Sequence, residues 1–295
     1  MTDIKKCPIC GDERFNLAIS AQDFTVSQET FTIKGCQNCQ LLITSPAPAK
    51  EAIGKYYQSD KYISHNDSAQ NLIGWIYLKA RNFTLKKKER LIATYQQEKT
   101  LLDYGCGTGE FVNYCKSTGW QVTGVEPSIQ ARAIAEQKAE QKIFAALNEI
   151  DLQVSTITLW HVLEHVHDLD ETISRLVTLL KKNGTMFIAV PNHKSWDANY
   201  FQQYWAGYDT PRHLWHFNTE NIKALFEKHN MKLVKKIPMK LDAFYISLMS
   251  EQYRQSKSPN LFTMIKSVCL GFYSNLKART TGEYSSLIYV LKHES

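Results

Sequence analysis

From about residue 92 onward, the positions of hydrophobic residues alternate between the period of strands and the period of helices. Each short apolar run is followed by a segment in which apolar residues recur every three or four positions. This alternation predicts an α/β fold with a largely parallel sheet and helices on both faces. The expected strands are 100–104, 121–125, 142–145, 156–160, 185–190, 232–237 and 286–292, and the expected helices are 110–117, 128–139, 169–181 and 220–229.

The clearest of these helices is the one expected over 169–181. Its apolar residues recur at i, i+3, i+4 and i+7 and so share one face: Ile173, Leu176, Val177 and Leu180. Gly184 is expected to stop this helix, because glycine readily adopts the left-handed conformation found at helix ends.

A glycine-rich loop follows the first expected strand, with the sequence Asp103-Tyr104-Gly105-Cys106-Gly107-Thr108-Gly109. Such a loop lets the backbone approach a ligand and directs a helix N-terminus at it. Glu126 ends the second strand, where an acid can accept hydrogen bonds from both hydroxyls of a ribose. In nicotinamide-binding enzymes the third glycine comes one residue later than Gly109 does here. Asp103 also suits an ammonium group better than a pyrophosphate, so a dehydrogenase is the weaker interpretation.

Four cysteines near the start of the chain form two CxxC pairs: Cys7, Cys10, Cys36 and Cys39. Each pair can present two sulfurs from one tight turn, and two such turns complete the tetrahedral site typical of structural zinc. Gly11 supplies a left-handed residue after the first pair, and short strands are expected at 24–26 and 30–33. A redox role is disfavoured, because neither pair opens a helix after a buried strand. We therefore predict a zinc ribbon over 1–45, serving folding or docking, and a helical linker or lid over 46–95.

The composition excludes several classes of protein. The chain has 295 residues, of which 43% are hydrophobic and 22% charged, as is ordinary for a soluble globular protein. The net charge of +6 is mild, and its short lysine runs are scattered, which favours a solvated surface over a nucleic-acid groove. No apolar stretch is long enough to span a membrane, and the first residues do not read as a signal peptide. With its cysteines in CxxC pairs rather than a disulfide framework, the chain is expected to be cytoplasmic.

Several motifs together resemble the class I S-adenosylmethionine-dependent methyltransferases. The loop at 102–109 and the segment 124–128 resemble the cofactor-binding motifs of that family. The segments 159–166 and 211–217 resemble the branch that contains ubiquinone-type O-methyltransferases. A four-cysteine segment before such a domain is similar to that of the deoxysugar C-methyltransferases. The resemblance covers residues 1 to about 237 and implies a Rossmann-like seven-stranded methyltransferase sheet, in a domain over 96–295.

The resemblance also implies which residues bind S-adenosylmethionine. The methionine part would be held by Asp103, Gly105, Cys106, Gly107 and Gly109, the ribose by Glu126, and the edge of the adenine by Leu147 and Asn148. The family often has an acid near Asn148, so the contact to the adenine amino group is expected to be weaker or water-mediated here. Trp160 and His161 would line the part of the pocket that holds the methionine and sulfonium groups.

Candidate catalytic residues gather after the fourth and fifth expected strands. His161, Glu164 and His165 stand at i, i+3 and i+4, and would share one face of a helix. His213 and His216 follow in an aromatic-rich loop. Methyl transfer is an in-line displacement from a sulfonium, so a base is needed only if the acceptor must lose a proton.

Three interpretations of these residues stay open. In the first, a histidine among His161, His165 and His213 acts as a general base. In the second, His161, Glu164 and His165 bind a divalent ion together with His213 or His216, an arrangement that resembles metal-assisted O-methyltransferases with a Glu-x-x-Glu-His run. Histidine at the first position would favour zinc or manganese over magnesium. In the third, the acid and the histidines only hold the loop.

Residues 238–284 are expected to form a helical insertion between the last two strands. The insertion contains an apolar stretch flanked by Lys266, Lys277 and Arg279. One interpretation is a lid over the acceptor pocket or a dimerisation element. The other is an interfacial helix that contacts a membrane or a lipid-linked acceptor.

These observations together predict a methyltransferase that acts on a small-molecule acceptor. O-methylation of a phenolic, quinol-like or sugar-derived hydroxyl is favoured over C-methylation. The alternatives are an RNA or protein methyltransferase docked through the ribbon, and a C-methyltransferase of a deoxysugar. An inactive scaffold is disfavoured, because Asp103, the three loop glycines and Glu126 are all present.

Overall fold

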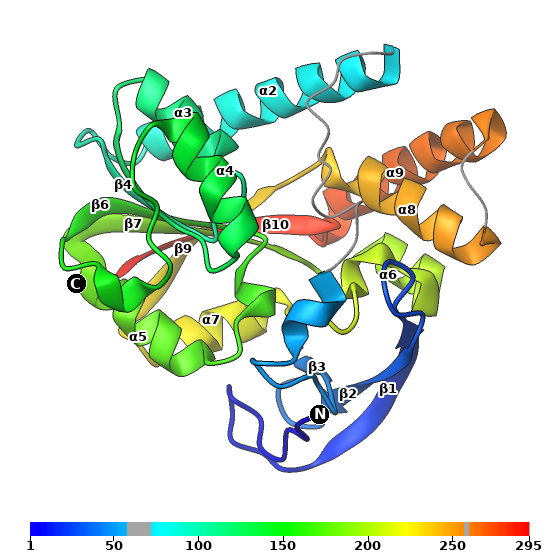
Figure 1. Cartoon of the computed structure of the whole chain (residues 1–295). Helices are drawn as coiled ribbons and strands as arrows, with labels where there is room; N and C mark the ends of the chain where they lie inside the picture. The colour runs from blue at the N-terminus through cyan, green and yellow to red at the C-terminus, as the bar shows by residue number, and fades with distance from the viewer. Residues whose placement is uncertain (58–71, 257–259, 295) are drawn as a thin grey trace.

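The computed structural model describes residues 1–57, 72–256 and 260–294, with side chains described outside 72–80. A central sheet runs through the larger part of the molecule (Figure 1). Its strands are β4 (Thr100–Tyr104), β5 (Gln121–Val125), β6 (Val154–Trp160), β7 (Leu180–Pro191), β9 (Met231–Pro238) and β10 (Ser286–His293). Their order across the sheet is β5-β4-β6-β7-β10-β9.

The first four strands of this order are parallel, and β10 runs antiparallel between β7 and β9. The predicted α/β fold with a parallel-rich sheet is therefore confirmed. The third expected strand, 142–145, is reduced to one isolated bridge between Phe144 and Val125. In the described residues the sheet thus has six regular strands where seven were expected.

Helices cover both faces of the central sheet, as predicted. They are α2 (Leu72–Ala93), α3 (Glu110–Ser117) and α4 (Ile129–Ala139) on one face, and α5 (Leu169–Leu179) and α7 (Thr219–Glu227) on the other (Figure 1). Alternate residues of β7 point into different layers. Phe187 and Ala189 pack in the cluster that contains Phe111 of α3, whereas Met186 and Ile188 pack in the larger cluster with α5 and α7.

One boundary differs from the prediction. The helix α5 ends at Leu179, and β7 begins at the next residue instead of after Gly184. Gly184 therefore lies inside the strand and does not cap the helix. A methyl group on Gly184 would lie 2.5 Å from Leu180 Cδ1, so the glycine leaves room for that buried leucine.

The N-terminal segment contributes three strands to a second, four-stranded sheet in the order β1-β2-β3-β8, and β8 comes from the large domain. Its strands are β1 (Phe15–Gln22), β2 (Thr30–Cys36), β3 (Leu42–Thr44) and β8 (Trp215–His216). The strand expected at 24–26 is wrong, because this stretch is a turn. The Asp23 carboxylate accepts hydrogen bonds from the amides of Thr25, Val26 and Ser27 at 3.0, 3.1 and 2.8 Å, which closes the turn.

The N-terminal sheet shares its core with the large domain. Cys7, Ile9 and Ile43 are buried in the same apolar cluster as Leu225 of α7 and Ile157 of β6. Two polar contacts join the same parts of the chain, one of them from Asn221 Nδ2 to the Cys39 carbonyl at 2.8 Å. The other runs from Lys228 Nζ to the Pro8 carbonyl at 2.8 Å. The ribbon therefore packs as one layer of the large domain. The boundary predicted for the ribbon, 1–45, stays a prediction.

Short helices carry the chain around the edge of the sheet. They are the 3-10 turns η1 (Ile53–Tyr57), η2 (Leu147–Glu149), η3 (Leu163–His165), η4 (Gln202–Tyr204) and η5 (Ala206–Tyr208), together with α6 (Trp196–Phe201). Between β9 and β10 lie α8 (Asp242–Gln255) and α9 (Leu261–Thr281), where a helical insertion was expected. Among the helices that the structure describes, none combines the length and apolar character needed to cross a membrane.

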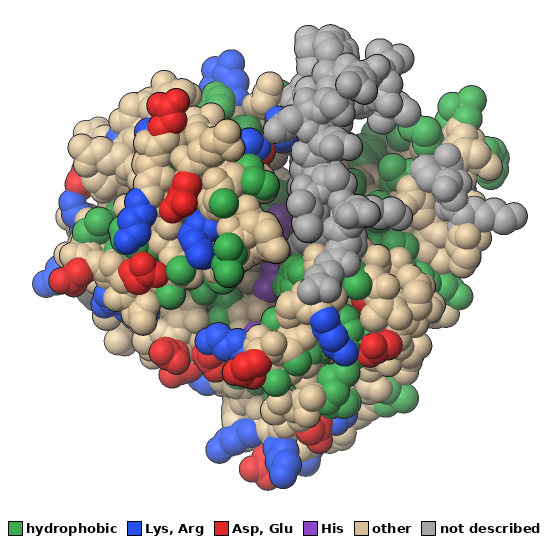
Figure 2. All heavy atoms as spheres, viewed as in Figure 1, with side chains coloured by type: hydrophobic (Ala, Val, Ile, Leu, Met, Phe, Trp, Pro, Cys, Tyr) green, Lys and Arg blue, Asp and Glu red, His purple; other side chains and the backbone are tan. Residues whose placement is uncertain are grey.

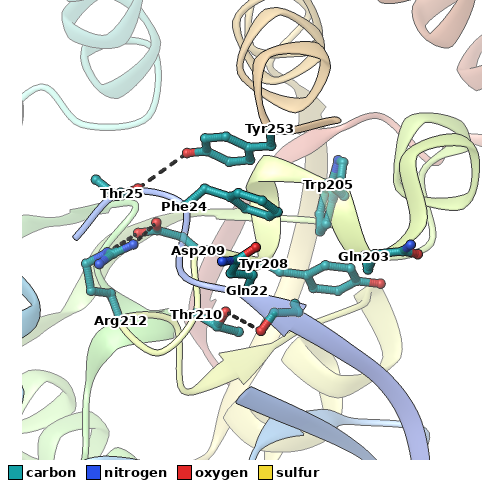
Figure 3. Close-up of a pocket in the computed structure, with 11 residues that line it drawn as sticks. Gln22, Phe24, Thr25, Gln203, Trp205, Tyr208, Asp209, Thr210, Arg212 and Tyr253 are labelled. Carbon is teal, nitrogen blue, oxygen red and sulfur yellow. Dashed lines mark hydrogen bonds and ion pairs between the residues drawn. The ribbon is translucent and has the colours of Figure 1, made fainter. Parts of the chain in front are cut away.

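Arg212 joins three separate parts of the chain through a buried guanidinium, of which 1% is exposed. It donates to Asp209 at 2.6 and 2.9 Å, to Asp23 of the ribbon at 2.9 Å, and to the Tyr56 carbonyl of η1 at 2.8 Å. Figure 3 shows this guanidinium directed at Asp209, beside a small pocket where Phe24 stacks on Tyr253 of α8. Burial lowers the pKa of Arg212, but the two carboxylates outweigh burial and raise it above its ordinary value.

We expect the substitution Arg212→Met to reduce the free energy of unfolding by about 3–5 kcal/mol, because it removes the counter-charge of the buried Asp23 and the partly buried Asp209 carboxylates. The measurement is urea-induced unfolding followed by circular dichroism. The control is Lys50→Met, which removes an exposed ion pair with Asp168 and should change stability by less than about 1 kcal/mol. Equal effects of the two substitutions would contradict the prediction.

Candidate active site

The glycine loop connects β4 to α3 at the carboxyl end of the parallel strands. Gly105, Gly107 and Gly109 all adopt left-handed backbone conformations, with φ of 72°, 55° and 82°. At Gly105 a methyl group would lie 2.5 Å from Val162 Cγ2, so any side chain there would clash. At Gly107 it would meet no atom within 4 Å. The backbone at Gly107 therefore borders open space, as a loop that accepts a ligand must.

Glu126 faces this loop from the end of β5. Its carboxylate accepts hydrogen bonds from the Gly107 amide at 2.8 Å and from the Ser128 amide at 2.9 Å. Burial raises the pKa of Glu126, and these amides oppose that rise. The structure thus places the predicted ribose-binding acid in hydrogen-bond contact with the predicted methionine-binding loop.

Asp103 lies beneath the loop at the end of β4 and is 2% exposed. Its carboxylate accepts a hydrogen bond from Thr158 Oγ1 at 2.6 Å. Burial raises the pKa of Asp103 to about 7, although this hydrogen bond and the charge of Lys88 both lower it. A buried carboxyl that titrates near neutrality would become fully ionised beside a cationic group such as an ammonium.

The other residues implied for the cofactor occupy two neighbouring elements. Trp160 ends β6, stacks edge-on against Phe111 at 5.5 Å, and has Lys88 Nζ 4.4 Å from its ring centre. Its indole nitrogen is buried without a hydrogen-bond partner among the described residues. Leu147 and Asn148 lie in η2, the first buried and the second exposed. The roles implied for these residues stay predictions.

His161 lies between two carboxylates. Its Nε2 is 3.1 Å from Asp242 at the start of α8, and its Nδ1 is 3.6 Å from Glu164 Oε1, an ion-pair distance. Burial lowers the pKa of His161, but Asp242 and Glu164 together raise it to about 9. His161 is therefore protonated at neutral pH, a state that cannot accept a proton from a substrate.

Glu164, His165 and His213 form the tightest cluster of potential metal ligands in the large domain as described, with ligand atoms within 4.8 Å of one another. Glu164 is 1% exposed, and neither of its carboxylate oxygens has a hydrogen-bond partner among the described residues. Burial raises the pKa of Glu164, but the nearby histidines outweigh burial and lower it. The carboxylate is therefore ionised, with His161 at ion-pair distance from Oε1 and no shorter hydrogen bond to either oxygen among the described residues.

The two histidines of this cluster are held by backbone carbonyls. His165 Nδ1 lies 3.0 Å from the Arg212 carbonyl, and His213 Nδ1 lies 2.9 Å from the Gly207 carbonyl. A carbonyl only accepts, so these contacts assign a proton to Nδ1, and in the neutral imidazole Nε2 then carries the lone pair. His213 Nε2 lies 4.0 Å from Glu164 Oε1. Tyr57, of η1, also places its hydroxyl 3.0 Å from His165 Nδ1.

The structure separates some residues that the sequence suggested together. His216 Nε2 forms a hydrogen bond with Thr44 Oγ1 of β3 at 3.1 Å. Of the two histidines considered as the last metal ligand, it is His213 that lies in the cluster with Glu164 and His165. His161 has φ of 58°, so it is not on a helix that continues through η3. Asp242 was missed, since no local motif marks an acid far along the chain in an insertion. Of the predicted linker or lid over 46–95, residues 58–71 and the side chains of 72–80 lie outside the described residues.

The four N-terminal cysteines converge as predicted. Cys7 and Cys39 have sulfurs 3.5 Å apart, as do Cys10 and Cys36, and all four sulfurs lie within 4.8 Å of one another. Ligands of a tetrahedral zinc with 2.3 Å bonds stand about 3.8 Å apart, so the set fits a zinc ion. Gly11 has φ of 75°, the left-handed conformation expected after the first pair.

Comparison with known proteins agrees with this geometry. A family model described as a methyltransferase domain matches residues 77–236, which is more than half of the chain. The chain belongs to this methyltransferase-domain family. The matched region carries the glycine loop, Glu126 and the cluster of Glu164, His165 and His213. The resemblance to class I methyltransferases drawn from the motifs is thereby confirmed.

Curated methyltransferases match a shorter region. A ubiquinone biosynthesis O-methyltransferase of Rhodopseudomonas palustris is 32% identical over 106 residues, covering 33% of this chain and 42% of its own length. An uncharacterized methyltransferase of Bacillus cytotoxicus is 33% identical over 98 residues, covering 30% of this chain and 45% of its own length. The chain thus spans less than half the length of these relatives.

Solved methyltransferase structures share the fold at low sequence identity. A phosphoethanolamine N-methyltransferase of Haemonchus contortus in complex with S-adenosyl-L-methionine is 16% identical, with a TM-score of 0.54 over 86% of this chain and 62% of that one. Magnesium protoporphyrin IX methyltransferase of Synechocystis with bound SAH is 14% identical, with a TM-score of 0.51 over 80% of this chain and 92% of that one. These likenesses show the fold of the methyltransferase-domain family.

We expect the affinity for S-adenosylhomocysteine to rise with pH up to about 7 and then level off. Asp103 has a pKa of about 7 in the free protein, and the ligand's ammonium group would lower it, so binding below that pH releases a proton. Titration calorimetry in buffers of different ionisation enthalpy measures both quantities.

The substitution Asp103→Asn should abolish this proton release and weaken binding about 10-fold, since about 1.4 kcal/mol of charge interaction is lost. The matched control is Asp151→Asn, at an exposed aspartate before β6. Proton release that persists in Asp103→Asn would reject the assignment of Asp103 as the titrating group.

Proposed function

We propose that this chain is an S-adenosylmethionine-dependent methyltransferase that methylates an oxygen of a small molecule, with a divalent cation at Glu164, His165 and His213. The observation that carries the proposal is the Glu164 carboxylate. It is buried and ionised, it lacks a hydrogen-bond donor among the described residues, and it faces two imidazoles. Protonated His161, 3.6 Å from Oε1, offsets part of this buried charge, and a divalent cation between Glu164 and the two other imidazoles would compensate it further.

The donor set fits a metal ion in its chemistry. Two imidazole nitrogens and one carboxylate are ligands that zinc, manganese and iron(II) accept. The Nδ1 protons of both histidines are fixed by backbone carbonyls, which is the usual outer support of metal-binding histidines. When bound, the cation would supply Lewis acidity that favours the ionised form of an acceptor hydroxyl.

The protein's own residues would then position the reactants. The glycine loop and Glu126 hold the cofactor that supplies the methyl group, and Trp160 and His161 border the side from which that group leaves. His161 stays anchored between Asp242 and Glu164, so it orients the loop that carries the metal ligands. In-line transfer depends mainly on such positioning, which supports a site built on rigid strand ends.

The proposed cation and one comparison favour oxygen as the acceptor atom. A metal ion beside the cofactor suits a hydroxyl that must lose a proton, whereas an amine acceptor needs no such help. The curated relatives include ubiquinone biosynthesis O-methyltransferases, one of them 32% identical over 106 residues. The ribbon packs into the core of the domain, which supports a role in the fold over a separate docking arm for RNA or protein.

The acceptor class is tested by incubating the protein with ¹³C-methyl-labelled S-adenosylmethionine and a panel of catechols, hydroquinones and sugars. We expect a methoxy carbon signal with a phenolic acceptor and none without protein. A signal from a carbon-bound or nitrogen-bound methyl group would reject O-methylation. Failure of the protein to bind S-adenosylhomocysteine would reject the methyltransferase assignment itself.

The metal site is tested by metal analysis of the full chain. We expect one zinc bound by the four cysteines and a second divalent ion that is lost in Glu164→Gln, with kcat/KM lower by about 100-fold or more. His167→Gln is the control, because that histidine lies near the cluster and bonds to the Pro48 carbonyl. An unchanged metal content in Glu164→Gln, with activity indifferent to chelator, would overturn the second site.

A further inference from the structure

The helix α9 has its large apolar side chains on the outside. Its buried residues are all small, at spacings of three and four: Thr263, Ser267, Gly271, Ser274 and Ala278. Its exposed residues include six large apolar ones, 45–73% exposed: Leu261, Phe262, Ile265, Val268, Phe272 and Leu276. We call these six side chains the outer face of α9. In a surface helix of a water-soluble protein, the large apolar residues face the core instead.

The inner side of α9 is already fully used in packing. A methyl group on Gly271 would lie 2.8 Å from Phe244 Cα, so the backbones of α8 and α9 approach closely there. Ser274 Oγ donates to the buried Asp197 of α6 at 2.6 Å. Rotating the helix to bury its large residues would break these contacts, so the outer face is fixed in its outward orientation.

The charges around the outer face are all of one sign. The helix α9 contains Lys266, Lys277 and Arg279 and no acidic residue. On α8, Asp242 turns inward to His161, and Glu251 is 0% exposed beneath Lys266 and Arg254. Lys266 and Arg254 share the single carboxylate of Glu251, and Lys277 and Arg279 are exposed. The surface of α8 and α9 around the apolar side chains is therefore net positive. Figure 2 shows hydrophobic side chains gathered at the side of the molecule formed by these helices.

We propose that the outer face of α9 binds the surface of an anionic lipid bilayer, lying in the plane of the interface. Apolar side chains enter the boundary between headgroups and acyl chains, while flanking lysines and arginines pair with anionic headgroups. The helix is about 31 Å long at 1.5 Å per residue, and no described helix is apolar enough to cross the bilayer. An in-plane orientation is the one that buries the outer face and keeps the cations in the headgroup layer.

A second copy of the chain is a poorer occupant of the same face. A two-fold contact between two α9 helices would bring cations from both copies to one interface, and α9 offers no carboxylate to pair with them. Anionic lipid supplies both the apolar phase and the counter-charge. The proposal concerns only where the protein binds, so it stands whether or not the proposed methyl acceptor is correct.

The test is flotation of the full chain with vesicles of phosphatidylcholine containing 30% phosphatidylglycerol, compared with phosphatidylcholine alone, at about 50 and 500 mM salt. We expect binding to the anionic vesicles that weakens at high salt. The variant Ile265→Ser/Phe272→Ser should reduce the bound fraction at least about 10-fold. The matched control Leu17→Ser/Val234→Ser removes two exposed apolar side chains elsewhere and should bind as the unsubstituted protein does.

Circular dichroism and S-adenosylhomocysteine binding verify that each variant is folded. Absence of vesicle binding by the unsubstituted protein, or equal binding by both double variants, would overturn the proposal. Light scattering after size exclusion gives the remaining outcome. A dimer that Ile265→Ser/Phe272→Ser converts to a monomer, without vesicle binding, would assign the outer face to a contact between copies and likewise reject the lipid surface.

Discussion

The buried guanidinium of Arg212 is the interaction on which the arrangement of the candidate site depends. It is bound by carboxylates from the ribbon and from its own loop, and by a carbonyl of η1. Its own carbonyl holds His165, and the next residue is His213. Burying a guanidinium is unfavourable unless every partner is in place, so the ribbon, η1 and the loop before β8 must assemble together. The imidazoles of the proposed metal site are thus positioned by an ion pair with the opposite end of the sequence.

This dependence gives the cysteine cluster a role beyond its own fold. The strand β3 of the ribbon pairs with β8. Thr44 Oγ1 of β3 donates a hydrogen bond to the His213 carbonyl at 2.7 Å. The ribbon also lies in one apolar cluster with the central sheet. A metal ion held by the cysteines would therefore stabilise the backbone behind the candidate ligands, although it would lie outside the cluster of Glu164, His165 and His213.

The sequence predicted the parts of this molecule whose signals are local. The bounds of β4, β5 and α3 agree residue for residue with the expected ranges, because apolar periodicity and the glycine loop are written in neighbouring residues. The expected strand at 24–26 failed, because the Asp23 carboxylate captures three amides in a turn. The helix at 169–181 was drawn too long, because glycine was assumed to end it and instead relieves crowding beside Leu180. Asp242 could not be found, since its contact with His161 exists only once the insertion has folded back onto the strand ends.

The position of β10 has a consequence for how the chain acquires its structure during synthesis. This strand lies between β7 and β9, and both neighbours leave the ribosome before it does. Until Ser286–His293 emerges, β7 and β9 present unpaired edges toward each other, a state open to pairing with other chains. The central sheet is therefore completed late in synthesis. A chain shortened before Ser286 would leave the edges of β7 and β9 unpaired and open to aggregation.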